Sequence, residues 1–389
     1  MNKDSPSRVT PSRTAGLRVL TFLNNFNPGG VERVALRLNV AWQAQDIEAI
    51  TIIGRDVGRA RGAVKGLAYT TLLDGSRWYH RWPLGGIVAD LPEIIRREQP
   101  DVLFCAGNTY SFAMVLMRLR LGRACPPIVA KISNDLRRAD QGLLLRAAYH
   151  LWLKVQGRCI AHFVGMAAPM VEEICKFCGV SADRVTIIND PILQADQIDR
   201  LAKTSCQQGP ARHGRHFLAI GRLTRQKNFP LLLAAFSRMA MADDVLTIVG
   251  DGVDRAALEA RIAHLGIADR VRLPGYTADV GSWFAVADAL VMSSDYEGVP
   301  AVIIEAIAAG LPIIATDCSV SMAELTGRGA FGTLVPVGDV VALAAAMAAL
   351  APTRPDAASA RAHVACFTVE QGAADYAALM RKVAANRAR

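Results

Sequence analysis

The sequence lacks the features that mark several large classes of protein. Charged residues break its apolar runs before they reach the roughly 20 residues that a membrane-spanning helix needs. Residues 1–16 are polar and rich in Ser, Pro and Arg, which predicts a disordered tail and no secretory signal. Because 52% of the residues are hydrophobic and only 20% are charged, the chain has enough apolar residues for a buried core, and wholesale disorder is excluded.

Motifs for zinc and for common nucleotide cofactors are also lacking. Among the eight cysteines, Cys175 and Cys178 form a single CxxC pair, and no second pair lies at the distance of a zinc site. We therefore expect free thiols in a reducing cytosol, not a metal or redox site. The glycines near the N-terminus, Gly29 and Gly30, have neither the GxGxxG nor the GxxxxGK[ST] spacing, so neither a dinucleotide-binding fold nor an NTPase loop is supported.

Positive charge is concentrated in the first half of the chain. Residues 1–210 contain 27 Lys and Arg against 18 Asp and Glu, whereas residues 211–389 contain 17 of each kind, so the net charge of +9 belongs to the first half. A basic face suits phospholipid head groups, a lipid diphosphate or nucleic acid. A soluble surface that is merely rich in Arg is the alternative, and composition alone does not choose the partner.

Short apolar runs alternate with amphipathic stretches along the chain, which predicts strands that are covered by helices on both faces of a parallel sheet. The expected strands of the first half are residues 18–24, 49–54, 101–106, 128–132 and 159–165, and those of the second half are residues 216–220, 245–250, 271–273, 289–293, 313–316 and 332–335. The polar, Gly- and Pro-containing stretch at residues 203–215 between them reads as a linker.

The sequence therefore predicts two doubly wound α/β domains in tandem, at residues 17–202 and 216–366. Residues 367–389 are expected to form a C-terminal helix that packs back across the domain junction. In such sheets ligands bind at the carboxyl ends of the strands, so we expect a cleft between the two domains.

The strongest motif is SSDYEGVPAVIIEAIAAGLPIIATD at residues 293–317, a strand end followed by a loop and a helix. Glu297 lies in the loop and Glu305 follows eight residues later on the helix, which Pro300 is expected to begin. Carboxylates accept hydrogen bonds from sugar hydroxyls, and backbone N–H groups at a helix start suit phosphates. Solvent-exposed acids on an ordinary strand–loop–helix unit are the alternative explanation.

Two further loops follow expected strands of the second half. In GRLTRQKN at residues 221–228, Gly221 permits a tight turn, while Arg222 and Lys227 can neutralise a diphosphate leaving group. Gly250 lies in a VGDG turn at another strand end and is expected to line the same cleft. In the first half, NPGGVER places Gly29 and Gly30 where a helix begins, so that the backbone can approach a ligand closely.

Taken together, the motifs SDYEGVPAVIIEAIAAGLPIIATD, GRLTRQKNF and GGVER resemble those of the retaining, GT-B-fold glycosyltransferases of family 4. The resemblance runs from about residue 18 to residue 380 and is more specific in the second half. It implies a GT-B fold, with two Rossmann-like domains and an interdomain cleft. The N-terminal domain is then expected to bind the acceptor and the C-terminal domain a nucleotide-diphosphate sugar.

The resemblance also implies roles for the charged residues. Glu297 matches the first Glu of the family's E-x7-E motif, which lies beside the donor hexose, and Glu305 matches the second, which holds the ribose hydroxyls. Arg222 and Lys227 match the basic pair that contacts the diphosphate. No metal and no cofactor is implied, because these cations and helix dipoles supply the positive charge.

Backbone positions are implied in the same way. Gly30 matches the family's N-terminal glycine near the phosphate, and Gly298, Val299 and Pro300 match the loop that cradles sugar and phosphate. Gly275 and Tyr276, in a Pro-Gly-Tyr stretch, fall where the family reads the nucleotide base.

The sequence departs from the family pattern in two places. Many members carry a His beside the transferred sugar, but the corresponding segment here is KISND at residues 131–135, so we expect Asn134 or Asp135 to bind a sugar hydroxyl. After Asp317 the family has a Gly-rich turn before its next Glu, whereas this chain has CSVSMAE at residues 318–324, which predicts a different donor-sugar pocket.

The segment LLLRAAYHLWLKVQGR at residues 143–158 mixes apolar and aromatic residues with basic ones. The segment could form a basic amphipathic helix that lies in a membrane interface. The same sequence is also compatible with a core-facing helix of the N-terminal domain. We favour the core-facing helix.

We therefore expect a cytoplasmic, metal-independent hexosyltransferase that uses a UDP- or GDP-sugar with retention of configuration. A saccharide or lipid-linked acceptor at the inner membrane face is the expected second substrate. Two alternatives stay open: a non-catalytic nucleotide-sugar-binding protein on the same scaffold, and a basic nucleic-acid-binding protein, for which no motif is present.

Overall fold

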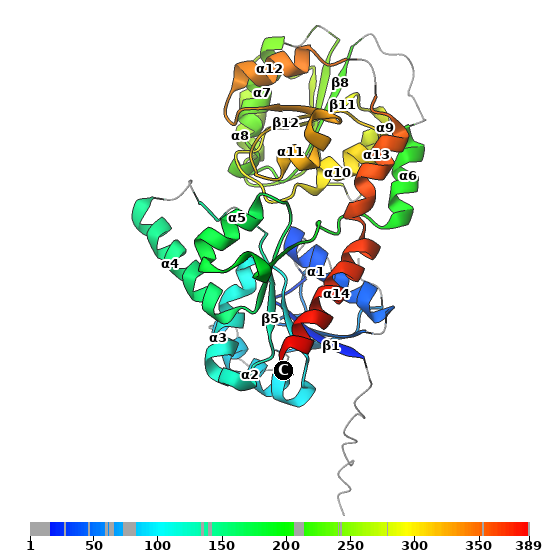
Figure 1. Ribbon diagram of the computed structural model, residues 1–389. Coiled ribbons are helices and arrows are strands. Elements are labelled where there is room, and N and C mark those ends of the chain that lie inside the picture. Colours follow the sequence, from blue (N-terminus) through cyan, green and yellow to red (C-terminus); the bar gives the residue numbers. More distant parts are fainter. Residues whose placement is uncertain are drawn as a thin grey trace, which may run out of the picture.

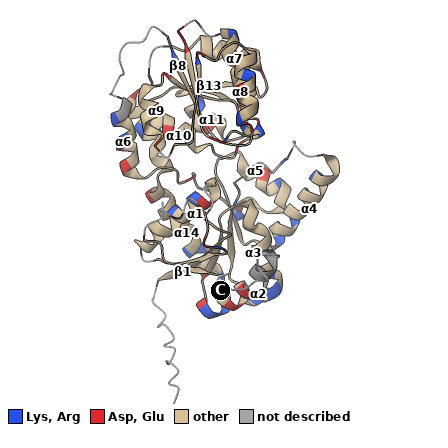
Figure 2. Ribbon diagram, turned by 180° about the vertical axis from the view of Figure 1, so that it is seen from behind, with Lys and Arg blue, Asp and Glu red and all other residues tan. Residues whose placement is uncertain are grey.

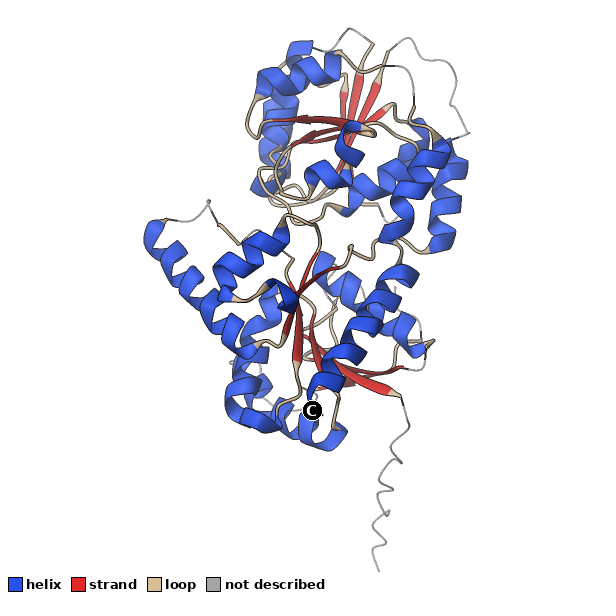
Figure 3. Cartoon of the chain, in the orientation of Figure 1, coloured by secondary structure: helices blue, strands red, loops and turns tan. Residues whose placement is uncertain are grey.

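The structure is a computed structural model of the chain. It describes residues 16–26, 29–45, 47–58, 61, 66–72, 83–133, 136–138, 142–205, 214–239, 241, 243–277, 279–351 and 354–387. Two α/β domains follow one another, each with a sheet that has helices on both faces, as Figures 1 and 3 show. This is the predicted fold class, which is therefore confirmed.

The N-terminal domain is built on a seven-stranded sheet in the order β3-β2-β1-β4-β5-β6-β7, and all its pairings are parallel. The strands are β1 (Leu17–Leu23), β2 (Ile47–Ile53), β3 (Tyr69–Thr71), β4 (Val102–Cys105), β5 (Ile128–Lys131), β6 (His162–Gly165) and β7 (Val185–Ile187). The helices are α1 (Gly30–Gln43), α2 (Pro83–Glu98), α3 (Ser111–Leu121), α4 (Leu143–Cys159) and α5 (Met170–Ile174). The short strands β3 and β7 at the two edges were not predicted.

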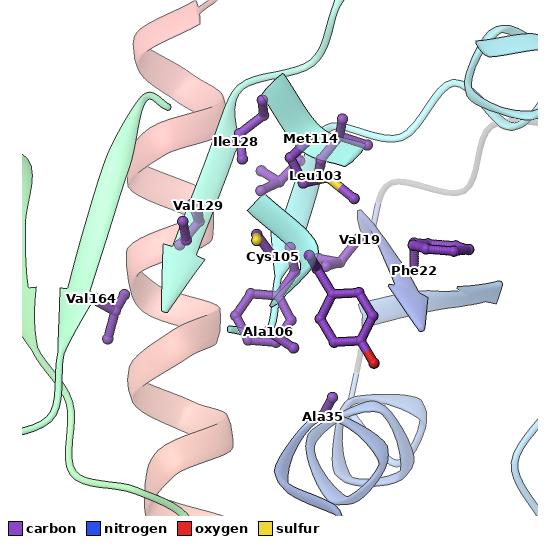
Figure 4. Close-up of a cluster of buried hydrophobic side chains, with 14 of the residues drawn as sticks. Val19, Phe22, Ala35, Leu103, Cys105, Ala106, Met114, Ile128, Val129 and Val164 are labelled. Carbon is purple, nitrogen blue, oxygen red and sulfur yellow. The ribbon is translucent and has the colours of Figure 1, made fainter. Parts of the chain in front are cut away.

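The core of this domain lies on both faces of the sheet. Val19, Leu103, Val129 and Val164 come from four neighbouring strands, and all are fully buried (Figure 4). In the same view Ala35 of α1 lies beside the strands. Helices cover both faces of the sheet, so the side chains on both faces of each central strand are buried. The sequences of these strands are therefore continuously apolar and do not alternate between apolar and polar residues.

The C-terminal domain has a six-stranded parallel sheet in the order β10-β9-β8-β11-β12-β13. Its strands are β8 (His216–Ile220), β9 (Val245–Val249), β10 (Val271–Gly275), β11 (Ala289–Met292), β12 (Ile313–Thr316) and β13 (Gly332–Val335). Its helices include α7 (Phe229–Met239), α8 (Arg255–His264), α9 (Gly281–Val286), α10 (Ala301–Ala308), α11 (Met322–Leu325), α12 (Val340–Ala348) and α13 (Ala357–Val364). Phe217 and Leu218, adjacent in β8, pack into separate apolar layers, as the alternating side chains of a strand covered on both faces must.

The chain enters the C-terminal domain earlier than predicted. Helix α6 (Ala195–Ser205) was assigned to the N-terminal domain up to residue 202, but Ile198 and Leu201 are buried in the core of the C-terminal domain. The apolar face of α6 has its partners there, which corrects the boundary. Of the expected linker, residues 203–205 are helical and residues 206–213 lie outside the described part of the chain, as does the expected tail up to residue 15.

The last helix, α14 (Val369–Arg387), returns to the N-terminal domain. Ala373, Tyr376 and Met380 belong to the N-terminal core, and the Trp42 indole donates a hydrogen bond to the Ala373 carbonyl at 3.1 Å. The two segments that pass between the domains are themselves joined, because the Ile192 N–H donates to the Phe367 carbonyl at 2.8 Å and the Val369 N–H to the Leu193 carbonyl at 2.8 Å.

Candidate active site

Two loops of the C-terminal domain form one side of the site. They follow β8 and β11, which are neighbours in the sheet, so their loops leave the same edge side by side. The Asp295 N–H donates to the Gln226 carbonyl at 2.9 Å, and the Ser293 hydroxyl donates to the Lys227 carbonyl at 2.9 Å. Asn228, in the left-handed conformation with φ of 43°, donates its side-chain amide to Asp295 at 2.6 Å. These bonds fix the two loops against each other.

Lys227 and Glu297, both predicted site residues, form an ion pair across these loops. The distance between Lys227 Nζ and Glu297 Oε1 is 2.5 Å, and the Gln226 amide donates to the other carboxylate oxygen at 3.3 Å. The two charged side chains are only 16% and 11% exposed. The pair is thus largely shielded from solvent, where an interaction between opposite charges is stronger than on an open surface.

A cavity of about 370 Å³ opens beside this pair and is lined by both domains. The C-terminal domain contributes Arg222, Gln226, Tyr296, Glu297, Gly298 and Val299, and the N-terminal domain contributes Gly30, Val31, Lys131, Ser133, Arg138, Met166 and Asp190. Arg222 and Glu297 therefore line one cavity, whereas Lys227 is not among its lining residues.

The domains touch at Gly298. A Cβ atom on this residue would lie 2.1 Å from the Ser133 carbonyl oxygen, so only glycine permits this approach of the loop to the end of β5. The next residue, Val299, packs against the apolar cores of both domains. Pro300 directly precedes α10, in an extended conformation, whereas the sequence predicted it inside the first turn.

Gly29 and Gly30 lie at the start of α1, facing the same region from the N-terminal domain. Gly29 occupies the N-cap position, and a Cβ there would lie 2.2 Å from the Glu32 carboxylate. Gly30 lines the cavity, and a Cβ there would meet nothing within 4 Å. Gly30 and Val31 thus bring the start of α1 to the cavity, and a helix start suits an anionic ligand.

Glu305 lies apart from that cavity lining. On α10 it faces Arg33 and Arg37 of α1 across the domain junction. Burial raises the pKa of the Glu305 carboxyl, and the two arginines oppose this only in part. Burial likewise lowers the pKa of Arg37, together with repulsion from Arg33, while Arg37 also donates a hydrogen bond to the Ile192 carbonyl. The sequence did not single out Arg37, although its spacing of four residues from Arg33 places both on one helix face.

The remaining predicted glycines lie at three neighbouring strand ends. Gly221, Gly250 and Gly275 follow or end β8, β9 and β10, and the Gly250 N–H donates to the Gly275 carbonyl at 2.9 Å. Gly250 has φ of 149°, and a Cβ there would lie 1.8 Å from the Gly221 carbonyl oxygen, so the close packing of these turns requires glycine. Tyr276 is 68% exposed. These residues flank the cavity lining without contributing to it.

A buried ion pair that the sequence did not predict lies on the cavity wall of the N-terminal domain. The Lys131 ammonium, at the end of β5, donates to the Asp190 carboxylate, and the Lys131 side chain is only 2% exposed. The two residues are 59 positions apart, so only the fold brings them together. Asn134 and Asp135, proposed from the sequence for this wall, lie outside the described residues.

The segment that departs from the family pattern supports the Glu297 loop. Ser319 and Ser321 both donate their hydroxyls to the Gly298 carbonyl at 2.8 Å, and the Glu297 N–H donates to the Cys318 carbonyl at 3.2 Å. Burial, with the nearby Glu297 carboxylate, raises the pKa of the Cys318 thiol to about 12, so this thiol is neutral at physiological pH. The serines, whose role the sequence did not reveal, hold the loop in place.

Two facing α/β domains with a cation–carboxylate cluster at the cleft define a class of protein, and comparisons with known proteins agree with it. Residues 28–192 match the family model described as Glycosyltransferase Family 4, and residues 214–352 match the model described as Glycosyl transferases group 1. Each domain therefore matches one glycosyltransferase family model, and the fold is the GT-B fold.

Curated relatives match over part of their length. The chain is 36% identical over 115 residues to the amylovoran biosynthesis glycosyltransferase AmsD of Erwinia amylovora, which is 30% of this chain and 33% of that protein. It is 32% identical over 130 residues, 33% of this chain and 37% of that protein, to the lipopolysaccharide core biosynthesis glycosyltransferase LpsE of Rhizobium meliloti. The matched region thus spans about a third of each relative.

Solved structures match almost the whole chain. The apo form of the lipopolysaccharide outer core galactosyltransferase WaaB superposes with a TM-score of 0.71 at 18% identity, over 94% of this chain and 99% of that one. Anabaena Alr3699/HepE in complex with UDP and glucose superposes with a TM-score of 0.67 at 17% identity, over 96% and 98% of the two chains. At this identity the likeness establishes the shared fold.

Among the described residues, no group of three or more His, Cys, Asp and Glu side chains is arranged to hold a metal ion. Nor does the described part of the chain contain a helix that is both long and apolar enough to cross a bilayer.

Proposed function

We propose that this chain transfers a hexose from a UDP- or GDP-sugar to an acceptor hydroxyl, with retention of configuration at the anomeric carbon. The observation that carries the proposal is an interdomain cavity that Arg222 and Glu297 both line, with Lys227 paired to the Glu297 carboxylate. Positive charge and a carboxylate at one cavity suit the two ends of a nucleotide-sugar, the diphosphate and the sugar hydroxyls.

The cations act on the leaving group. As the bond between the anomeric carbon and the phosphate oxygen stretches, negative charge grows on the diphosphate. We assign its stabilisation to Arg222, which lines the cavity, and to Lys227, which is paired with Glu297 of the cavity lining. These residues supply the charge without a metal. Accessible N–H groups at the start of α1, beside Gly30, add donors from the other wall.

Glu297 is assigned to the donor hexose, because its carboxylate can accept hydrogen bonds from the sugar hydroxyls. Before the donor binds, the ion pair holds the Lys227 and Glu297 side chains in place. The bound donor then replaces part of the contact between them. Glu305 is assigned to the ribose, and Arg33 and Arg37 partly offset the rise of its pKa that burial causes.

Retention is proposed to proceed by same-side attack assisted by the departing phosphate. A covalent intermediate on a carboxylate would need a second carboxyl group close to the first across the sugar. Asp190, the described carboxylate that lines the N-terminal wall, is already paired with buried Lys131. The acceptor hydroxyl then transfers its proton to an oxygen of the leaving phosphate.

The acceptor is proposed to be a saccharide or lipid-linked saccharide in the synthesis of cell-surface polysaccharide, lipopolysaccharide or glycolipid, at the cytoplasmic face of the inner membrane. Relatives named for amylovoran and lipopolysaccharide core biosynthesis support this class of acceptor. The excess of positive charge in the first half of the chain suits an anionic lipid-linked substrate.

The test measures donor binding and donor turnover together. UDP-, GDP- and ADP-sugars are screened for a rise in Tm, since a ligand that binds only the folded state stabilises it. Release of UDP or GDP from the stabilising donor is then measured for the wild type, Glu297→Ala and Lys227→Gln. We expect each variant to lose about 100-fold or more in turnover, the usual effect of removing one group that stabilises transition-state charge.

Arg225→Gln is the matched control for Lys227→Gln. Arg225 lies on the same short turn and is exposed, whereas Lys227 is paired with Glu297 of the cavity lining. Its turnover should stay within a factor of about two of the wild type. Donor binding without turnover in the wild type would instead favour a non-catalytic nucleotide-sugar-binding protein.

A further inference from the structure

Helix α4 exposes a row of leucines to solvent. The exposed fractions are 75% for Leu143, 89% for Leu144, 62% for Leu145 and 67% for Leu151. Ala147 and Ala148, between them on the helix, are exposed too. The solvent side of a helix is normally polar, and a continuous apolar row on it marks a surface with a partner. Figure 1 shows that the N-terminal end of α4 projects from the body of its domain.

Other side chains of α4 hold the helix to the domain. The rings of Trp152 and Phe112 of α3 lie 5.7 Å apart, and those of His150 and Phe177 lie 4.5 Å apart. The Lys154 ammonium donates to the Lys176 carbonyl at 2.8 Å. The expectation of a core-facing helix thus holds for its second half, where Leu153 is buried, and fails for its first half. The leucine row is a fixed feature of the surface.

Charge on α3 and α4 has one sign. The two helices and the turn Gly122–Ala124 between α3 and β5 contain no Asp or Glu, but they contain six basic residues, Arg118, Arg120, Arg123, Arg146, Lys154 and Arg158. Helix α3 adds two exposed apolar side chains, Leu119 at 67% and Phe112 at 43%. Figure 2 shows the basic residues in blue on these elements. We call this surface, the apolar and basic side chains of α3 and α4 together, the α3–α4 face.

A pocket of arginines lies at one end of the α3–α4 face. It has a volume of about 360 Å³, and five arginines but no carboxylate line it: Arg118, Arg123, Arg158, Arg184 and Arg387. Backbone carbonyls hold three of the guanidinium groups, since Arg118 donates to Gly122 at 3.0 Å, Arg184 to Gly157 at 3.0 Å and Arg387 to Ala124 at 3.1 Å. Fixed guanidinium groups without a carboxylate among them suit phosphate, which they bind through two parallel N–H groups.

We propose that the α3–α4 face docks on an anionic phospholipid membrane. The leucines enter the boundary between head groups and acyl chains, and the arginines bind lipid phosphates. Basic residues beside Leu, Trp and Phe on helices that lie on the surface are the pattern of interfacial membrane helices. A nucleic acid would bind the arginines through its phosphates but would leave the leucines exposed to water. It would therefore explain the basic side chains of this face and not the apolar ones.

Docking through this face would place the cleft next to the bilayer. Arg138 lines the interdomain cavity and lies five residues before Leu143, the first residue of α4. Only a few residues therefore separate the leucine row from the cavity lining along the chain. This consequence, though not the docking itself, rests on the proposed function with a lipid-linked acceptor.

Cosedimentation with lipid vesicles tests the proposal on the full chain. One set of vesicles is phosphatidylcholine alone, and the other is an equal mixture of phosphatidylcholine and phosphatidylglycerol. We expect binding to the anionic vesicles that weakens as salt is raised. The triple variant Leu143→Ser, Leu144→Ser and Leu151→Ser, and separately the double variant Arg123→Glu and Arg158→Glu, should each bind at least about tenfold more weakly, given about 1 kcal/mol for each basic residue near the surface.

The controls make the same two kinds of change, apolar to Ser and Arg to Glu, at exposed positions of the C-terminal domain. Val253→Ser with Val341→Ser removes two apolar side chains that are 89% and 64% exposed, and Arg238→Glu reverses an exposed charge on α7. Both controls should bind vesicles as the wild type does. Since every changed side chain is exposed, all variants should keep the wild-type Tm, which separates lost docking from lost folding.

The proposal fails if the wild type binds neither kind of vesicle, binds both equally, or binds unchanged after the leucine substitutions. A dimer that dissociates in the leucine variant, without vesicle binding, would assign the face to a second copy and overturn the membrane. Rise of Tm with the donor is measured on the same samples. If the chain binds donor but no vesicles, the transferase proposal stands and the membrane proposal is wrong. If it binds vesicles but no donor, the membrane proposal stands and the transferase proposal is wrong.

Discussion

Glu305 is a carboxylate that the empty protein holds at a cost. Burial raises its pKa, and the attraction of Arg33 and Arg37 does not fully offset that effect. The ionised form is thus less favourable in the folded chain than in the unfolded chain. Residues in binding sites often carry such a cost, because they are placed for a ligand and not for stability.

Replacing this charge should stabilise the protein while it weakens donor binding. We expect Glu305→Gln to raise the free energy of unfolding at neutral pH by about 0.5–1 kcal/mol, a common gain when a charge in a functional site is removed. The gain should shrink as the pH falls from neutral through the raised pKa of the folded state, and it should be absent below 4.5, the ordinary pKa of the group, where the wild-type carboxyl is neutral in both states. Urea denaturation across this pH range measures it.

Donor affinity of the same variant gives the second half of that prediction. Loss of the carboxylate should weaken binding of the UDP- or GDP-sugar about tenfold, since it removes a hydrogen bond to a charged group. If Glu305→Gln is less stable than the wild type at neutral pH, the burial of the Glu305 charge does not cost the folded protein stability, and this account of the residue is wrong. Glu259→Gln, on exposed α8, is the control and should change neither quantity.

The residues of the C-terminal wall could be predicted from sequence because each follows a strand within one continuous motif. Arg222, Lys227 and Glu297 all lie in loops directly after β8 and β11. The Lys131–Asp190 pair could not be predicted, because its partners come from two distant strand ends and neither belongs to a motif. Arg138, a second cavity residue from the N-terminal wall, was hidden for the same reason.

At the scale of elements, the loop after β11 joins the two domains through main-chain packing. The Gly298 carbonyl accepts hydrogen bonds from Ser319 and Ser321, and its Cα faces the Ser133 carbonyl. Since both neighbours on the Ser133 side are backbone atoms, they cannot move aside as a flexible side chain could. The orientation of this loop, and with it of Glu297, depends on the absence of a side chain at this position.

Gly298→Ala should therefore disturb the junction. The added Cβ would lie 2.1 Å from the Ser133 oxygen, so we expect a loss of about 1–3 kcal/mol in the free energy of unfolding, together with weaker donor binding. Gly30→Ala is the matched control, because Gly30 lines the same cavity and its Cβ would meet nothing within 4 Å. Its stability should change by less than about 0.5 kcal/mol. Equal effects of the two substitutions would contradict the packing described for Gly298.

The sequence predicted long elements better than their boundaries. Central strands were found because their apolar runs are continuous, but the three-residue edge strands β3 and β7 are too short to show a period. Helix α6 was assigned to the wrong domain, because an amphipathic pattern says that one face is buried and not which core buries it. The same limit explains α4, whose apolar residues face solvent over its first half.

At the scale of the molecule, the chain crosses between the domains twice, at residues 192–193 and 367–369. The two crossings are hydrogen-bonded to each other, and α14 then packs into the N-terminal core. This arrangement ties both ends of the C-terminal domain to one place at the side of the cleft. Motion of the domains about that place would change the width of the cavity, which both domains line.

The central claim is that this cavity binds the diphosphate of an activated sugar between the cations of the C-terminal domain and the start of α1. The most direct test is a crystal structure of the chain with bound UDP, or with GDP if the Tm screen selects it. The account predicts diphosphate oxygens within about 3.2 Å of Arg222 and Lys227, on the side of the cavity that Glu297 lines. A nucleotide bound elsewhere, with Arg222 and Lys227 making no contact to phosphate, would contradict it.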